Sequence, residues 1–73
     1  MSYFIELDGT PLCAFKYRGV IAHQWGRVIH PIYQMKGFAR IEYFSIPEQA
    51  QRFIDKNRNF CKGAVIREHQ GPM

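Results

Sequence analysis

The stretch FARIEYFSIPEQAQRFIDKN, residues 38–57, contains the change of hydrophobic period that decides the fold class. From Phe38 to Phe44, apolar residues alternate with the charged Arg40 and Glu42, which predicts a strand. From Ser45 onward, apolar residues recur every three to four positions, which predicts an amphipathic helix over about residues 46–56. A strand that leads directly into an amphipathic helix indicates an α+β fold.

Both ends of this helix carry expected boundary residues. Ser45 and Glu48 have the S-x-x-E spacing of a capping box, in which each side chain accepts a backbone N–H of the first turn. Pro47 suits the first turn because its missing N–H has no intrahelical partner there. Asn57 can adopt the left-handed conformation that ends many helices. The apolar face consists of Ile46, Ala50, Phe53 and Ile54.

Further strands are predicted on both sides of the helix. Gly in Asp8-Gly9 and Lys36-Gly37 accepts the positive φ of a hairpin turn, and Arg18-Gly19 is a weaker break. Val20–Gln24 is either a strand of its own or a continuation of the one before it. The expected strands are Tyr3–Leu7, Leu12–Tyr17, Val20–Gln24, Arg27–Met35, Phe38–Phe44 and Ala64–His69. We therefore expect one α+β domain over residues 1–69, with a small antiparallel β-sheet of four to five strands and the helix packed on one face. Residues 70–73 are expected to form a frayed tail.

Composition restricts the function classes. The chain has 73 residues, 47% of them apolar, and carries ten Lys and Arg against six Asp and Glu, a net charge of +4. A chain this short buries only about 60% of its unfolded surface and has one small core. The sequence pI of about 9.4 is typical of nucleic-acid-binding domains.

We expect a cytoplasmic protein. The chain shows neither a signal peptide nor an apolar run long enough to span a membrane, so no membrane partner is expected. Only Cys13 and Cys61 are present, too few for the disulfide framework of a small secreted domain. Both thiols are expected to be free, although a Cys13–Cys61 disulfide stays open if their strands are neighbours.

No catalytic or metal-binding pattern is found. His23, His30, His69 and the two cysteines lack the close ligand pairs that anchor a zinc site. The carboxylates are scattered singly, and no glycine-rich phosphate loop precedes a helix. We therefore expect no enzyme activity, no metal and no cofactor.

The segment YRGVIAHQWGR, residues 17–27, predicts a contact surface. Flat aromatic side chains beside cationic ones suit phosphate contact combined with stacking or groove insertion. We expect these groups to project from the sheet face that the helix leaves bare. The candidate binding residues are Lys16, Tyr17, Arg18, Trp25, Arg27, Tyr33, Lys36 and Arg40.

The order of these motifs resembles a known DNA-binding domain. YRGV, four residues, WGR and then FSIPEQAQRFID over residues 17–57 is similar to the plant Apetala-two/ethylene-response-factor domain, and arm-binding domains of some phage integrases look alike. The resemblance implies a three-stranded sheet that enters the DNA major groove, with Arg18 and Trp25 as contacts and Arg27 at the basic position after Trp-Gly. Ile21 and His23 stand where that family has arginines.

Two classes of partner follow. The resemblance favours DNA or another polyanion, and the sequence does not distinguish DNA from RNA. The alternative is a phage or mobile-element protein that inhibits a host or defence protein by binding it, because Trp, Tyr and Arg also dominate protein interfaces. A homodimer through a free sheet edge is a third alternative.

Overall fold

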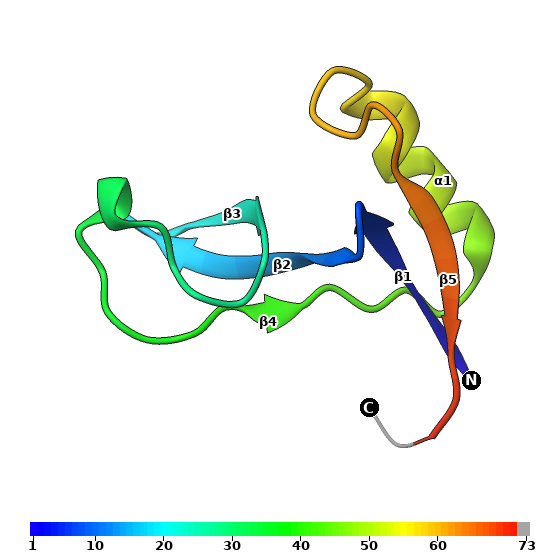
Figure 1. The fold of residues 1–73 in the computed structure, drawn as a ribbon, viewed down its shortest axis with the longest axis horizontal. Helices are drawn as coiled ribbons and strands as arrows, with labels where there is room; N and C mark the ends of the chain where they lie inside the picture. Colours follow the sequence, from blue (N-terminus) through cyan, green and yellow to red (C-terminus); the bar gives the residue numbers. More distant parts are fainter. Residues whose placement is uncertain (72–73) are drawn as a thin grey trace.

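The computed structural model describes residues 1–71 and shows an α+β fold, in which one helix packs on a five-stranded antiparallel sheet (Figure 1). The predicted fold class is confirmed. The elements are β1 (Ser2–Leu7), β2 (Thr10–Tyr17), β3 (Val20–Trp25), the 3₁₀-helix η1 (Pro31–Tyr33), β4 (Arg40–Ile41), α1 (Pro47–Lys56) and β5 (Val65–His69). The strand order is β3-β2-β1-β5, and β4 pairs with β2. Residues 72–73 of the predicted tail lie outside the described residues.

Two tight hairpins join the first three strands. Asp8 and Gly9 have φ of 51° and 81°, and Arg18 and Gly19 have the same pair of values. Two consecutive positive φ angles are typical of a type I′ turn, whose twist matches that of the strands it joins. The Arg18-Gly19 break therefore separates two strands, and Arg18 lies at the tip of the second hairpin.

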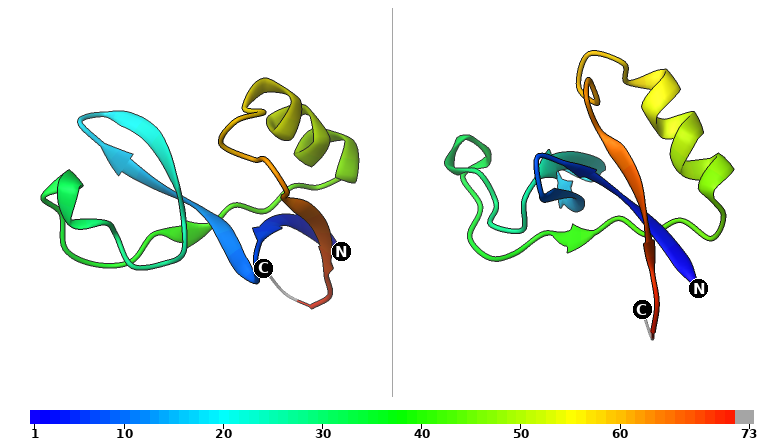
Figure 2. Two further views of the ribbon diagram at one scale, coloured as in Figure 1. Left: turned by 45° about the horizontal axis from the view of Figure 1, so that its top comes forward. Right: turned by 45° about the vertical axis from the view of Figure 1, so that its right-hand side comes forward.

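Strand β2 pairs with β3 along one edge and with two different strands along the other. At its start it pairs with β1, through Glu6–Pro11 and Leu7–Thr10. Farther along, the same edge pairs with β4, through Cys13–Ile41 and Ala14–Arg40. The molecule consequently has two lobes: one contains β2, β3, η1 and β4, and the other contains β1, β5 and α1 (Figures 1 and 2).

Each lobe has its own small core, so the single core expected from the length of the chain is wrong. Leu12 and Cys13 are both fully buried but point to opposite faces of β2, since successive side chains of a strand alternate. The first core lies between β2, β3 and the loop around η1, and its buried members are Cys13, Phe15, Ile29 and Ala39. The second core lies under α1; Ile5, Leu12 and Ala50 are buried there, with Trp25, Phe44, Phe53, Ile54, Ala64 and Ile66 packed around them.

The strand predicted over Arg27–Met35 is wrong. This segment is a loop that contains η1, and the side chain of Gln24 holds it. Gln24 Nε2 donates to the carbonyls of Gly26 (2.8 Å) and Val28 (2.6 Å), and its Oε1 accepts from the N–H of His30 (3.1 Å). A side-chain amide thus satisfies backbone groups that a strand would pair in a ladder.

The strand predicted over Phe38–Phe44 is shorter than expected, because successive parts of it pair with different partners. Phe38 forms an isolated bridge with Val28, Arg40–Ile41 pairs with β2, and Phe44 forms a bridge with Tyr3 of β1. The chain is extended throughout, but only its middle belongs to a continuous ladder. This segment runs from one lobe to the other (Figure 1).

The predicted helix is confirmed over Pro47–Lys56, but its capping differs from the prediction. The N-cap residue is Ile46, which has no side-chain cap, and the N–H of Ser45 donates to Gln49 Oε1 at 3.2 Å. At the other end Asn57 has φ of −131°, so it is not left-handed. Its Nδ2 instead donates to the carbonyl of Phe53 at 2.9 Å.

We predict that Phe53→Ala destabilises the fold by about 2–3 kcal/mol, because it leaves a cavity where α1 meets the sheet. The Phe53 ring lies 4.8 Å from the ring of His23 and 6.3 Å from that of Phe44. Urea unfolding monitored by circular dichroism measures the change. The control Gln51→Ala, on the exposed side of the same helix, is expected to stay within about 0.5 kcal/mol of wild type.

Candidate nucleic-acid interface

Charge is divided unequally between the two lobes. From Gly9 to Ile41 the chain contains five Lys and Arg and no Asp or Glu, a charge of +5. The rest of the chain contains five Lys and Arg against six Asp and Glu, a charge of −1, so the two parts sum to the net +4. Residues 9–41 contain β2, β3, η1 and β4, and we call them the basic lobe.

All five cationic side chains of the basic lobe are exposed: Lys16, Arg18, Arg27, Lys36 and Arg40. In the part of the chain that the structure describes, the ion pair of a Lys or Arg is that of Arg67 with Glu6, and the other carboxylate contact is the hydrogen bond of Glu42 with His23. No carboxylate therefore neutralises a Lys or Arg of the basic lobe. The lobe presents a field of one sign to solvent.

The cationic groups do not share one face of the sheet, contrary to expectation. Lys16 pairs with Ile21, and Ala14 pairs with both His23 and Arg40, so these side chains lie on the same face. Arg18 turns to the opposite face, where its guanidinium carbon lies 5.2 Å from the ring centroid of Tyr17. Lys36 lies in the loop before β4, outside the sheet.

Trp25 does not project from a bare face, and this prediction is wrong. Trp25 pairs with Leu12, which places the indole on the side of β2 and β3 that faces the second core. There the indole stacks on Phe60, with ring centroids 5.1 Å apart and an interplanar angle of 23°. Because one side of the indole is covered and the residue is half-buried, Trp25 is poorly placed to stack on a base or enter a groove.

Tyr17 and Tyr33 are half-buried at the rim of the first core. Their rings meet edge to face at 5.2 Å, and Tyr33 meets Phe15 in the same way at 4.7 Å. These contacts hold η1 against the hairpin. Tyr17 also supports the guanidinium of Arg18. Both rings are therefore engaged in contacts within the lobe and neither offers a free surface.

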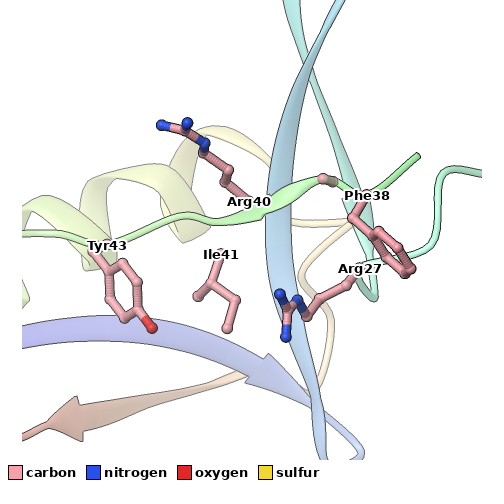
Figure 3. A pocket seen from close by; sticks show the side chains of 6 residues that line it. Arg27, Phe38, Arg40, Ile41 and Tyr43 are labelled. Carbon is pink, nitrogen blue, oxygen red and sulfur yellow. The ribbon is translucent and has the colours of Figure 1, made fainter. Parts of the chain in front are cut away.

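Arg27 lines an open hollow of about 710 Å³ beside β4. Figure 3 shows its guanidinium on the same side of β4 as Ile41 and Tyr43, whereas Arg40 points to the opposite side. Phe38 lies at the end of the hollow next to Arg27. Neither Phe38 nor Tyr43 is among the candidate binding residues, although Phe38 lies between Lys36 and Arg40 in the sequence, which is the signal that points to it.

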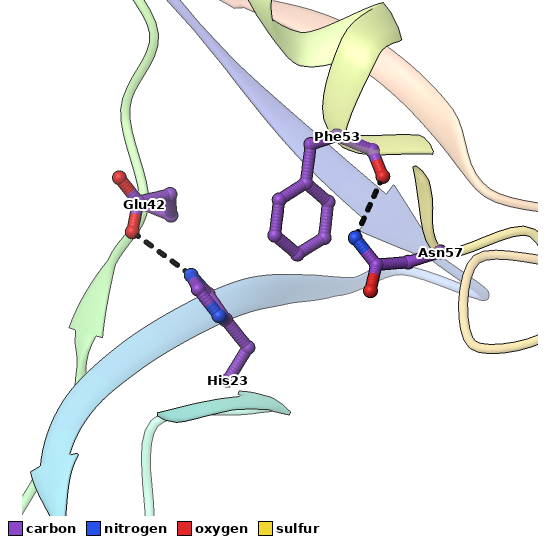
Figure 4. A network of polar contacts seen from close by, with 4 residues as sticks. All are labelled: His23, Glu42, Phe53 and Asn57. Atoms are coloured by element: carbon purple, nitrogen blue, oxygen red, sulfur yellow. Dashed lines mark hydrogen bonds and ion pairs between the residues drawn. The ribbon is translucent and has the colours of Figure 1, made fainter. Parts of the chain in front are cut away.

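A polar contact between His23 of β3 and Glu42 lies where the two lobes meet. His23 Nε2 and Glu42 Oε2 are 3.3 Å apart, and the His23 ring packs edge-on against Phe53 of α1 (Figure 4). Glu42 is the first carboxylate after the basic lobe. Because it faces His23, it leaves Arg40 without a partner although the two residues are close in sequence.

The thiols are buried in separate places. Cys13 is fully buried in the first core, Cys61 is 3% exposed in the turn region after α1, and both are free. Burial raises the pKa of both thiols, and the nearby Arg27 partly offsets this rise for Cys13. A protonated, covered thiol is a poor nucleophile. Within residues 1–71 no three His, Cys, Asp or Glu side chains are grouped closely enough to hold a metal ion.

We predict that Ellman's reagent labels neither cysteine of the folded protein at about pH 7.5, because both thiols are covered and protonated. Labelling in urea is expected to be at least about 100-fold faster, since it then no longer waits for rare opening of the fold. Absorbance at the released thiolate's band gives both rates. Rapid reaction of one thiol in the folded protein would contradict the burial described above.

No protein-family model, curated protein or solved structure matches the chain. No helix in the described residues combines the length and the apolar character needed to cross a membrane.

Proposed function

We propose that the protein is a non-enzymatic module that binds nucleic acid through the basic lobe. The observation that carries this proposal is the unneutralised charge of the lobe: five exposed Lys and Arg, and no carboxylate from Gly9 to Ile41. Cations that contact phosphates release condensed counterions, which is the main source of sequence-independent affinity for nucleic acid.

The positions of the cations indicate phosphate contacts rather than base readout. They lie at the tip of the β2–β3 hairpin, on both sides of β4 and in the loop before it. Cations distributed in this way can hold the sugar-phosphate backbone of a nucleic acid, but they do not form a row of side chains that could read base edges. The proposed contact residues are Lys16, Arg18, Arg27, Lys36 and Arg40. Trp25 is not among them because it stacks on Phe60.

We predict a steep salt dependence of binding. If three to five phosphates are contacted, raising the salt from about 50 to 200 mM is expected to weaken binding of a 20-nucleotide probe roughly 20- to 500-fold. Fluorescence anisotropy with a labelled single strand and a labelled duplex measures this. Affinity that does not change with salt, or no binding to either probe, would overturn the proposal.

Variants locate the interface. Arg40→Gln removes one unpaired cation of the basic lobe and is expected to reduce the slope of log K against log salt by about 1. The matched control is Arg52→Gln, which removes an exposed cation from α1 in the other lobe. The control is expected to keep the wild-type slope. Equal effects of the two substitutions would show that net charge, and not the basic lobe, drives binding.

A second candidate function is protein binding by strand addition to β3. Strand β3 is an edge of the sheet, and Val20 and Ile21 are 62% and 60% exposed. Since the two-residue turn makes Tyr17 and Val20 a hydrogen-bonded pair, Ile21, His23 and Trp25 direct their backbone groups outward. An unpaired edge of this kind can accept a strand from a partner.

Ile21→Pro tests this candidate because it removes one outward N–H and no bond to β2; edge strands tolerate proline at such positions. A protein partner captured from nuclease-treated host lysate is expected to bind the variant at least about fivefold more weakly. Binding of nucleic acid is expected to be unchanged. Equal capture by the two proteins, or no captured protein, would contradict strand addition at β3.

A further inference from the structure

Phe38 is the most exposed aromatic residue of the described chain, with 72% of its surface accessible. Leaving a phenylalanine side chain in water forgoes the roughly 1.5–3 kcal/mol that its burial supplies. Among residues 1–71, no other aromatic ring packs against it. A ring this exposed offers a flat apolar surface to a ligand.

The backbone around Phe38 is held in place although its side chain is free. Phe38 forms a bridge with Val28, and the N–H of Ala39 donates to the carbonyl of Arg27 at 2.6 Å. Ala39 itself is 2% exposed in the first core. The ring therefore projects from a fixed point of the basic lobe, which lowers the entropy cost of stacking on it.

Cations flank this ring. Arg27, Ile41 and Tyr43 lie on one side of β4 and Arg40 on the other, and no carboxylate lines the hollow (Figure 3). A chain that follows β4 past Phe38 thus meets an aromatic face, a guanidinium group on either side and the Tyr43 side chain. This combination of stacking surface and cationic track is how proteins hold unpaired nucleic-acid strands.

We propose that the hollow beside β4 binds single-stranded nucleic acid, with one unpaired base stacked on Phe38 and the adjoining phosphates on Arg27 and Arg40. This inference rests on the proposed function and specifies its ligand. In a duplex the base faces are already stacked on their neighbours, and a protein must extrude a base to reach one. Phe38 thereby takes the stacking role that the sequence suggested for Trp25.

The experiment compares Phe38 variants on matched probes at one salt concentration. The probes are a labelled single strand of about 20 nucleotides, as DNA and as RNA, and the duplex of the same sequence. Phe38→Leu keeps an apolar side chain but removes the ring, and Phe38→Trp enlarges the ring. The control is Ile32→Ala, which truncates another exposed apolar side chain of the same lobe that does not line this hollow.

We expect wild type to prefer the single strand, and Phe38→Leu to lose roughly 5- to 150-fold in single-strand affinity. Its duplex affinity, its salt slope and its unfolding midpoint are expected to stay unchanged. Phe38→Trp is expected to keep the affinity and to show quenching of its added tryptophan emission when the single strand binds. Ile32→Ala is expected to behave as wild type on every probe.

The failures of the two proposals are distinguishable. Salt-dependent binding of both probes with no effect of Phe38→Leu overturns the stacking site and leaves the basic lobe as a general nucleic-acid interface. No binding to any probe overturns both proposals. A protein partner whose capture from nuclease-treated lysate depends on Phe38, without single-strand preference, also overturns the stacking site and assigns the hollow to a protein interface.

Discussion

Along one edge of β2, backbone hydrogen bonds go first to β1 and then to β4. The change of partner occurs at Leu12, whose carbonyl accepts the N–H of Glu42 at 3.0 Å. Both cores depend on this point, because Leu12 is buried on one face of β2 and Cys13 on the other. One strand thus joins two small lobes, neither of which contains enough apolar surface to be stable alone.

The division into lobes also separates opposite charges. All six carboxylates lie outside residues 9–41, and Glu42, which directly follows this segment, faces His23 at the boundary. Repulsion among five cations lowers the stability of the basic lobe, and an anionic partner would relieve it. The lobe consists of short strands and a loop that Gln24 holds, so its cations project in several directions.

The two contacts implied by the resemblance to the plant DNA-binding domain differ in their exposure to solvent. Arg18 lies in the turn before β3, and Trp25 is the last residue of β3. Arg18 is at the exposed tip of the hairpin, and Trp25 is at its base against Phe60. The exposed ring is Phe38, on an adjoining segment whose backbone pairs with Val28.

Local chemistry was enough to predict much of the fold. Three local features predicted the α+β class and the helix from the sequence alone: the positive φ allowed at Asp8-Gly9, the alternation through β1 and β2, and the helical spacing of Ala50, Phe53 and Ile54. Each of them depends only on residues that are close in sequence. The concentration of basic residues between Gly9 and Ile41 was visible in the sequence as well.

Long-range pairing, in contrast, was decided only by the tertiary structure. The segment from Val28 to Phe44 takes its partners from β1, β2 and its own loop, and the side of the sheet that Trp25 faces depends on its pairing with Leu12. Both depend on register between distant residues, and a shift of one residue would exchange the two faces of the strand.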